Sequence, residues 1–327
     1  MNLTVIIPAL NEEATIGDVI GRLPRQIAGV DRVEIVVVDD GSSDRTGEIA
    51  AAAGALVVRH RHNRGVGAAF RSGLAAALDR QADIVVNMDA DGQFNPADVP
   101  ALIQPILDGR ADMTTCTRFA RKELIPEMPA IKKWGNRMMC RLINRICWNS
   151  HFTDVSCGFR AYSRQTAMQL TLFGDFTYTQ ESFIDLVAKG VQIEEVPLKV
   201  RGVREIGKSR VASNLWAYAR QSAMIILRAA RDIRPLAFFG SIGAILLAMG
   251  VLCGGIVFGW WLATGQTSPI RSLLIGSGAF LTLGFLSIML ALLADMLGRQ
   301  RKLVEQLLAM HRDRRRQDAD GPDRGGA

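Results

Sequence analysis

The stretch Ile84-Val-Val-Asn-Met-Asp89-Ala-Asp91-Gly-Gln93 runs from an apolar segment directly into two aspartates. Alternate side chains of an extended chain point to one side, so the carboxylates of Asp89 and Asp91 are expected to face the same way. Anionic oxygen ligands at a strand end suit Mg²⁺ or Mn²⁺, which keep open positions for phosphate oxygens. Aspartates also cap turns, so the surrounding sequence must decide between a metal site and a turn cap.

Short β-rich runs alternate with helical patterns around this stretch. Apolar runs occur at Leu3–Pro8, Val33–Val38, Ala55–Val58 and Ile84–Met88, and a helical spacing of apolar residues begins at Ile16. This alternation predicts βαβ units and an α/β fold with a mainly parallel sheet. Ligands bind at the carboxyl ends of the strands in such sheets. The polar clusters at those ends are Asn11-Glu12, Asp39-Asp40 and Asp89-Ala90-Asp91.

Two long uncharged segments lie near the C-terminus. Leu236–Ala263 has 28 residues without a charge and Ser272–Ala294 has 23. Each exceeds the roughly 20 residues that cross a bilayer core of about 30 Å. Glycines in these segments suit close helix packing, and Trp260 and Trp261 suit a membrane interface. Arginines flank both outer ends, which predicts a transmembrane hairpin with both ends in the cytoplasm. A pair of buried core helices is the alternative.

The chain is therefore expected to contain four regions. They are an α/β domain at 1–210, a connector at 211–235, two transmembrane helices within 236–297 (about 236–263 and 272–294), and a charged cytoplasmic tail at 298–327. The connector carries apolar residues at helical spacing with arginines among them, so it either lies at the membrane interface or packs on the domain. The tail is expected to be disordered from residue 312. Membrane hairpins often associate, which makes a homo-oligomer one alternative for the assembly.

Composition narrows the class of protein. Hydrophobic residues make up 49% and charged residues 22%, which excludes a disordered chain and a carrier built mostly of spanning helices. The net charge of +7 favours an anionic partner: nucleic acid, lipid headgroups or phosphorylated substrates. The sequence contains no nucleic-acid recognition motif, so nucleic acid is not expected as a partner. The five cysteines form no CxxC pair and the N-terminus lacks a secretory signal, which predicts free thiols in a reducing compartment.

Several motifs in a fixed order give the two aspartates their context. IPALNEEATIG, VVVDDGSSDRT, Asn63-Arg64-Gly65-Val66-Gly67 and NMDADGQFNP together closely resemble the inverting family 2 glycosyltransferases, which have the GT-A fold. DVSCGFRAYSR (Asp154–Arg164) and Arg204-Glu-Ile-Gly-Lys208-Ser resemble the polyprenyl-phosphate branch, typified by dolichol-phosphate mannose synthase. The resemblance covers roughly residues 2–212, and no QxxRW motif of processive synthases is present.

The resemblance implies roles for the residues at the strand ends. They would bind a nucleotide diphosphate-sugar donor together with Mg²⁺ or Mn²⁺. The residues implied in the nucleotide-sugar pocket are Pro8, Ala9, Asn11, Glu12, Asp39, Asp40, Asp89, Ala90 and Asp91. Asp39 and Asp40 would hold the base or ribose, because a carboxylate accepts two hydrogen bonds. The metal ligands would be Asp89, Asp91 and Gln93.

The resemblance also implies a site for a phosphorylated lipid acceptor. Arg118, in Cys-Thr-Arg-Phe, matches an arginine that would contact the acceptor phosphate. Lys132 and Asn136 keep the spacing of a second phosphate-binding pair with changed residues, so Lys133 or Arg137 could serve instead. The late basic loop would close over the diphosphate through Arg204 and Lys208. Surface charge is the alternative for all these cations.

Gln180-Glu181 occupies the place where many family 2 enzymes carry an acidic general base. A hydroxyl acceptor needs a base, whereas a phosphomonoester arrives largely ionised because its second pKa is about 6. Three functions remain open: transfer of a sugar to polyprenyl phosphate, transfer to a hydroxyl of a lipid or glycan with Glu181 as base, and non-catalytic binding of a nucleotide sugar. The sequence does not separate a uridine from a guanosine donor.

Overall fold

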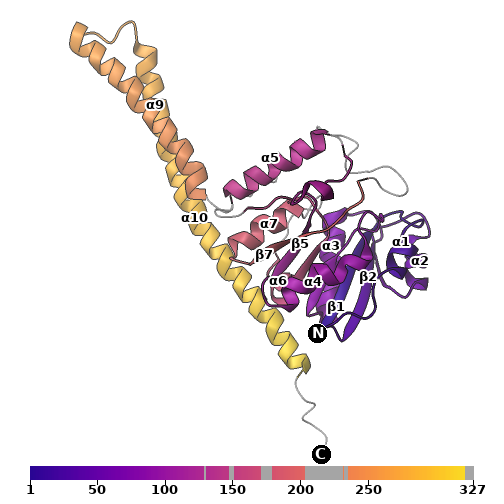
Figure 1. Ribbon diagram of the computed structural model, residues 1–327. Coiled ribbons are helices and arrows are strands. Elements are labelled where there is room, and N and C mark those ends of the chain that lie inside the picture. The colour runs from indigo at the N-terminus through magenta and orange to yellow at the C-terminus, as the bar shows by residue number, and fades with distance from the viewer. Residues whose placement is uncertain (129, 147–150, 171–178, 203–230, 232–234, 321–327) are drawn as a thin grey trace, which may run out of the picture. The chain divides into compact units, whose positions relative to one another are not determined.

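The computed structural model describes residues 1–128, 130–146, 151–170, 179–202, 231 and 235–320 (Figure 1). The chain divides into two compact units, Met1–Ile225 and Ile226–Ala327. The connector expected at 211–235 lies outside the described residues, apart from residues 231 and 235. Its place at a membrane surface therefore stays a prediction.

A mixed sheet forms the centre of the first unit. Its strands are β1 (Asn2–Ala9), β2 (Arg32–Asp39), β3 (Leu56–Arg59), β4 (Ile84–Asn87), β5 (Met113–Thr117), β6 (Arg160–Ser163) and β7 (Ile193–Pro197). Their spatial order is β3-β2-β1-β4-β6-β5-β7. Strand β6 runs antiparallel to β4 and β5, and the other neighbouring pairs are parallel. The α/β fold with a mainly parallel sheet is therefore confirmed.

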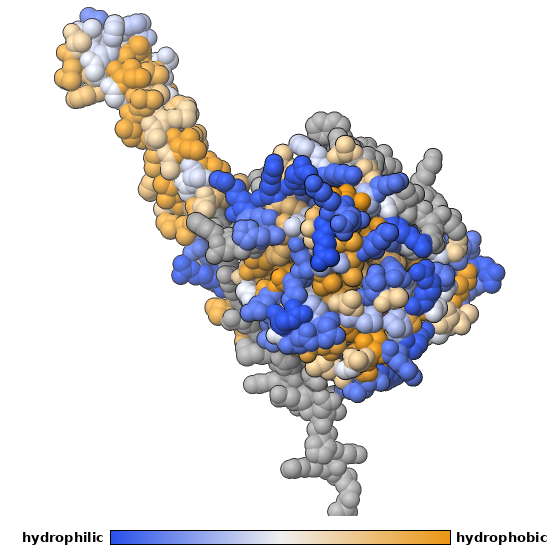
Figure 2. Space-filling view, viewed as in Figure 1, coloured by the Kyte–Doolittle hydropathy of each residue, from blue (hydrophilic) through white to orange (hydrophobic). Residues whose placement is uncertain are grey.

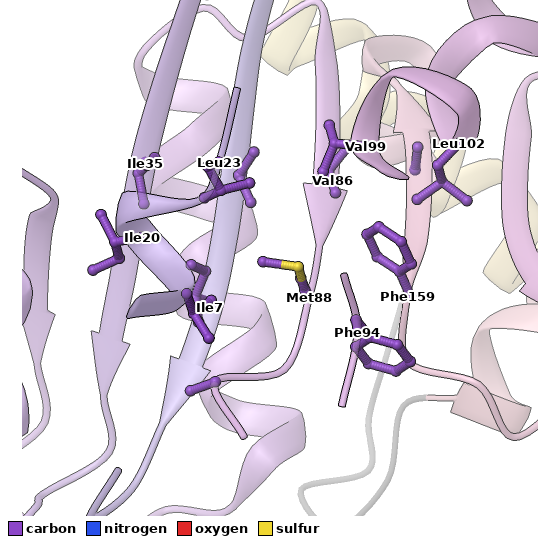
Figure 3. Packing of buried hydrophobic residues seen from close by; sticks show 14 of the residues in the cluster. Ile7, Ile20, Leu23, Ile35, Val86, Met88, Phe94, Val99, Leu102 and Phe159 are labelled. Atoms are coloured by element: carbon purple, nitrogen blue, oxygen red, sulfur yellow. The ribbon is translucent and has the colours of Figure 1, made fainter. Parts of the chain in front are cut away.

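Helices cover both faces of this sheet. Those on one face are α1 (Ile16–Gly21), α2 (Thr46–Ala52) and α4 (Val99–Leu107), and those on the other are α3 (Val66–Asp79), α6 (Arg164–Gln169) and α7 (Thr179–Ala188). Alternation along β1 sends Ile7 to the first face and Ile6 to the second. Figure 3 shows Ile7, Val86 and Leu102 in the core of the first face. Short 3₁₀ helices lie at Pro96–Asp98 and Lys122–Leu124.

The strand directions bring the candidate residues to one edge of the sheet, here called the site edge. β1, β2 and β4 are mutually parallel and end there, β1 at Ala9 and β2 at Asp39. Because β6 is antiparallel to both of its neighbours, β5 and β7 also end there, at Thr117 and Pro197. β6 itself begins there, at Arg160. The loops that follow these strands therefore meet at one rim, where ligands of such sheets bind.

The second unit contains two long helices, α9 (Pro235–Thr264) and α10 (Arg271–Asp320). Both are long and apolar enough to cross a membrane, over Pro235–Thr264 and Arg271–Gln300, and few residues in these spans are buried. Figure 2 shows the apolar part of this unit covered mainly by hydrophobic side chains. An exposed apolar surface of this extent suits lipid better than a protein core.

Helix α10 extends beyond the predicted span. The uncharged run predicts a helix that ends near residue 294 and the charged tail predicts disorder from residue 312, but α10 continues to Asp320. Its 50 residues reach about 75 Å, more than a bilayer core of about 30 Å requires. The disorder prediction is wrong for residues 312–320, because arginine, glutamine and alanine favour helix there.

Glycines let α9 and α10 approach closely. A Cβ added at Gly243 would lie 2.9 Å from the carbonyl oxygen of Gly284, and one at Gly250 would lie 3.0 Å from the amide nitrogen of Leu281. The Ser277 hydroxyl donates a 2.8 Å hydrogen bond to the carbonyl of Gly250. Small residues and hydroxyl hydrogen bonds of this kind hold membrane helices together.

Gly250→Val is expected to destabilise the α9–α10 pair by about 1–3 kcal/mol, because the added side chain overpacks the interface. The matched control is Gly255→Val, since a Cβ at Gly255 would meet nothing within 4 Å. Thermal unfolding of the full chain in detergent measures the difference. Equal melting temperatures for the two variants would contradict this packing.

Candidate active site

The aspartates of the metal motif follow β4 at the site edge. Asp89 is half-buried, and Asp91 is buried with 4% of its surface exposed. Asp91 Oδ1 accepts the backbone N–H of Gln93 at 3.1 Å. Phe94 then stacks on Phe159 with ring centroids 5.2 Å apart, which fixes the end of the loop in the core (Figure 3). The motif is therefore held by a turn on one side and by aromatic packing on the other.

The oxygen atoms at this point fit a hard divalent cation. Asp89 and Asp91 carry carboxylates, and Gln93 donates its Nε2 to the carbonyl of Arg201 at 3.3 Å, which leaves Oε1 as a further oxygen. Within the described part of the chain, no three His, Cys, Asp or Glu side chains group as a metal cage. Mg²⁺ is usually held by one or two carboxylates with phosphate and water oxygens, so the donor set suits such an ion beside a diphosphate.

The segment after β7 returns to the metal motif. Arg201 N–H donates to the carbonyl of Gln93 at 3.0 Å, and the Gln93 side chain donates back to Arg201. A Cβ added at the next residue, Gly202, would lie 2.3 Å from the carbonyl oxygen of Glu127. Only glycine permits this approach of the two backbones. Two of the sequence-predicted residues follow directly, Arg204 and Lys208, and both lie outside the described residues.

Hydrogen bonds join the loops that follow β1 and β2. Asn11 Oδ1 accepts the N–H of Ser43 at 2.8 Å, and Asn11 N–H donates to Ser42 Oγ at 3.0 Å. Glu12 N–H donates to Thr46 Oγ1 at 2.8 Å. The sequence-predicted pocket residues in this region are Pro8, Ala9, Asn11 and Glu12. They belong to one hydrogen-bonded rim, and their contact with a nucleotide stays a prediction.

Asp39 and Asp40 are both buried at the end of β2. Asp39 Oδ1 accepts a backbone N–H of the following turn at 2.8 Å, and Arg59 Nε lies 3.3 Å from Oδ2 without hydrogen-bond geometry. Asp40 accepts the N–H groups of Arg64 and Gly65, at 3.0 and 2.8 Å, one on each oxygen. Both carboxylates thus shape the loops around the predicted nucleotide pocket.

Arg118 reaches the site edge at the end of β5. Its Nε and Nη2 donate to the two oxygens of Asp154 at 2.6 and 2.9 Å, a bidentate ion pair. The Asp154 side chain is fully buried, and the Arg118 side chain is 18% exposed. Burial alone would lower the pKa of the Arg118 guanidinium, but the ion pair with Asp154 raises it. Nη1 makes no hydrogen bond to any described residue, so it can donate to an incoming anion.

Ser156 connects this arginine to α5 (Ala130–Ile146). Arg118 Nη2 donates to Ser156 Oγ at 2.9 Å, and the Ser156 hydroxyl donates to Asn136 Oδ1 at 2.9 Å. Asn136 Nδ2 donates to the carbonyl of Thr153 at 3.1 Å. The structure therefore brings together Arg118 and Asn136, two residues that the sequence analysis placed at the acceptor phosphate.

Glu195 on β7 holds the turn that carries Asp154. Its Oε1 accepts the N–H groups of Thr153 and Asp154, both at 2.9 Å, and its Oε2 accepts the Thr153 hydroxyl at 2.8 Å. Burial raises the pKa of Glu195, and these hydrogen bonds oppose the rise. Neither acid can be predicted from local sequence, because partners 36 and 41 residues apart leave no local pattern. The only signal was the DVSCGFR motif around Asp154.

The lysines predicted near the acceptor lie on α5. Lys133 is half-buried and Arg137 is exposed. The side chain of Lys132 lies outside the described residues. A phosphate-binding role for these cations therefore stays a prediction.

Gln180 and Glu181 lie in the first turn of α7. Gln180 is buried and Glu181 is half-buried. Arg160 holds this turn: its Nη1 donates to the carbonyl of Thr179 at 2.8 Å and to Ser182 Oγ at 2.5 Å. The other guanidinium nitrogens reach the carbonyls of residues 155 and 157, at 3.1 and 2.8 Å. A fully buried arginine that the sequence analysis did not single out therefore joins α7 to the Asp154 segment.

Arg160→Met is expected to destabilise the first unit by about 3 kcal/mol or more, because it leaves several buried carbonyls without a donor. Arg141→Met on the exposed face of α5 is the matched control and should change stability by less than about 0.5 kcal/mol. Urea unfolding followed by near-UV circular dichroism compares the two. Similar midpoints would contradict the assigned role.

Comparison with known proteins agrees with this architecture. Two relatives are UDP-N-acetylglucosamine–dolichyl-phosphate N-acetylglucosaminyltransferase of Methanococcus voltae (30% identical, over 60% of this chain and 84% of that protein) and polyprenol monophosphomannose synthase of Mycolicibacterium smegmatis (29%, over 64% and 81%). Glucosyl-3-phosphoglycerate synthase of Mycobacterium tuberculosis, solved with Mn²⁺, UDP and phosphoglyceric acid, is 28% identical with a TM-score of 0.55, over 70% of this chain and 78% of that one. Residues 4–171 match the family described as Glycosyl transferase family 2. With its seven-stranded GT-A sheet and the motifs at the site edge, the chain belongs to glycosyl transferase family 2.

Proposed function

We propose that this glycosyltransferase moves a hexose from a nucleotide diphosphate-sugar to a polyprenyl phosphate, undecaprenyl or dolichyl, with inversion at the anomeric carbon. An oxygen of the lipid phosphate attacks C1 of the sugar, the bond from C1 to the diphosphate breaks, and the nucleoside diphosphate leaves. Such a lipid-linked sugar is the kind of donor used in building cell-envelope glycans. The names of the two curated relatives support this acceptor class.

One observation carries the proposal: Arg118 presents a guanidinium that Asp154 has already fixed. Two of its nitrogens are taken by Asp154 and Ser156, whereas Nη1 has no partner within the described residues. A pre-organised cation loses little entropy on binding a phosphate and offers a directed N–H pair. Asn136 adds a polar group beside it through Ser156. A phosphate acceptor matches this cluster better than a hydroxyl does.

The donor would bind at the neighbouring loops of the site edge. Asp89 and Asp91, with the Gln93 amide oxygen, would hold Mg²⁺ or Mn²⁺ at the diphosphate. A divalent cation there neutralises charge on the leaving group as a Lewis acid. The loops of β1 and β2 would orient the nucleotide, and Arg204 and Lys208 would cover the diphosphate. The protein then contributes positioning and charge stabilisation more than covalent chemistry.

The acceptor phosphate requires no general base. Its second pKa is about 6, so it is largely dianionic at neutral pH. Gln180 and Glu181 would then orient the sugar or hold the first turn of α7. Transfer to a hydroxyl acceptor with Glu181 as base is the alternative. The M. tuberculosis enzyme was solved with phosphoglyceric acid, which is not a lipid.

The two apolar helices would anchor the enzyme where its acceptor lies. Arginines outside both spans favour a hairpin in the cytoplasmic membrane, with the first unit and the C-terminal end of α10 in the cytoplasm. The basic net charge suits anionic headgroups there. Membrane lipids are therefore partners of the enzyme, and self-association of the hairpin is a further expectation.

Membranes that contain the full chain test the proposal. They are incubated with radiolabelled UDP- and GDP-sugars and with undecaprenyl or dolichyl phosphate, or with the corresponding free polyprenols, with and without Mg²⁺ or Mn²⁺. We expect metal-dependent labelling of a polyprenyl phosphate from one sugar nucleotide and none of the free alcohols. Labelling of the alcohols in preference would contradict the phosphate acceptor.

A further inference from the structure

A buried histidine joins the site edge to helix α3. His60 Nδ1 lies 2.6 Å from Asp40 Oδ1, and His60 Nε2 lies 2.9 Å from Ser72 Oγ. The side chains of His60 and Asp40 are 6% and 5% exposed. The proposed transfer reaction does not use this histidine, and no sequence motif singles it out.

The hydrogen bonds of Asp40, His60 and Ser72 determine which ring nitrogen of His60 carries a hydrogen. Both oxygens of Asp40 accept backbone N–H groups, from Arg64 and Gly65, which suits an ionised carboxylate. An ionised carboxylate can only accept, so His60 Nδ1 carries a hydrogen and donates it to Asp40. In a neutral ring Nε2 then accepts the hydrogen of the Ser72 hydroxyl. The tautomer is thus fixed from both ends.

The imidazole is held by three elements of the fold. The His60 N–H donates to the carbonyl of Asp39 at 2.9 Å, which continues the pairing of β3 with β2 beyond Arg59. Ser72 on α3 holds the far side of the ring, and Asp40 at the end of β2 takes the near side. A ring fixed in this way acts as a rigid support behind the Asp40 carboxylate.

We propose that His60 is a positioning residue for the nucleotide part of the donor, acting through Asp40 and touching no substrate itself. This inference rests on the proposed function, in which Asp40 borders the nucleotide pocket. Without the Nδ1 donor, the carboxylate keeps two backbone donors among the described residues and turns away from its present orientation. The loop of Arg64 and Gly65 donates two N–H groups to the same carboxylate and therefore shifts when the carboxylate turns.

The effect is specific to the donor, because the acceptor cluster does not share this network. Arg118 is fixed by Asp154 and Ser156, and none of its hydrogen bonds within the described residues involves Asp40 or His60. Loss of a hydrogen bond to a charged group corresponds to about tenfold or more in affinity. Loss of the His60 hydrogen bond should therefore weaken nucleotide binding and raise the donor KM by this factor. The acceptor KM should stay within about twofold of the wild-type value.

Three variants of the full chain in detergent micelles test the inference. His60→Leu removes both hydrogen bonds, whereas His60→Asn keeps an N–H near the position of Nδ1. His62→Leu is the matched control, because His62 is an exposed histidine of the same loop. Calorimetry measures the binding of UDP and of GDP with Mn²⁺, and initial rates give the donor and acceptor KM.

We expect His60→Leu to weaken nucleotide binding and raise the donor KM about tenfold, with His60→Asn within about threefold of the wild type and His62→Leu unchanged. Wild-type affinity in His60→Leu would overturn the inference, as would an equal loss in His60→Asn or a parallel rise of the acceptor KM. If His60→Leu does not fold, His60→Gln replaces it, because its amide reaches Ser72 and not Asp40. If the wild-type chain binds neither nucleotide, the proposed function itself is refuted. If the wild-type chain binds a nucleotide and His60→Leu binds it equally well, only this inference is refuted.

Discussion

Asp91→Asn is expected to lower sugar transfer by about a thousandfold or more at saturating Mn²⁺, a loss of about 4 kcal/mol of transition-state stabilisation. Asparagine keeps a side-chain oxygen for the Gln93 N–H that Asp91 now accepts at 3.1 Å, so the turn should persist. It removes the charge with which a carboxylate holds a hard cation beside the diphosphate. Initial rates over a Mn²⁺ titration measure the loss.

The control for this substitution is Asp18→Asn, on the exposed side of α1. Asp18 forms a 3.1 Å ion pair with Arg22 at i,i+4, and such surface pairs contribute about 0.3–0.5 kcal/mol. Its transfer rate should equal that of the wild type. A wild-type rate for Asp91→Asn with the metal fully bound would show that Asp91 is not a metal ligand.

Substitution at Arg118 should affect both stability and acceptor binding. Arg118→Gln leaves the fully buried Asp154 without its cation, which costs about 3–5 kcal/mol of folding free energy. It also removes the donor proposed for the lipid phosphate, so the acceptor KM should rise by about 10- to 100-fold. Urea unfolding measures the first effect and initial rates with varied polyprenyl phosphate measure the second.

A double variant separates the two effects. Arg118→Gln with Asp154→Asn removes both charges and keeps groups that can hydrogen-bond to each other, so most of the stability should return. The acceptor KM should remain raised, and the donor KM should stay near the wild-type value. Recovery of the acceptor KM in the double variant would show that Arg118 only supports the fold.

Local patterns predicted much of the fold and part of the site. The apolar run before Asp89 and Asp91 predicted a strand with two carboxylates at its end, and β4 ends at Asn87, two residues before Asp89. The same reasoning placed Asp39 at the end of β2. Strand ends are local in sequence, and in a parallel sheet they share an edge, so these residues could be placed together without a structure.

Contacts between distant segments could not be predicted in this way. Nothing in the sequence shows that β6 inserts antiparallel between β4 and β5, which is what brings Asp154 beside Arg118. His60 was missed for a similar reason: its two partners, Asp40 and Ser72, lie 20 and 12 residues away on other elements. Buried polar networks depend on tertiary packing, and single-residue patterns do not record them.

The second unit shows the limit of hydropathy as a guide. Uncharged segments correctly indicated two long apolar helices, because a bilayer core sets their minimum length. They did not indicate where α10 ends, because hydropathy does not measure the helix propensity of the charged residues that continue α10 to Asp320. The high charge of the C-terminal part of α10 therefore did not indicate whether it is helical.

The central claim is that a phosphate, and not a hydroxyl, accepts the sugar. ³¹P NMR of undecaprenyl phosphate, incubated with the full chain, Mn²⁺ and the sugar nucleotide selected by the donor screen, tests it most directly. We expect the phosphomonoester signal to be replaced by that of a phosphodiester whose sugar has the anomeric configuration opposite to that of the donor. An unchanged phosphomonoester signal while the sugar nucleotide is consumed and its sugar appears on a hydroxyl would contradict it.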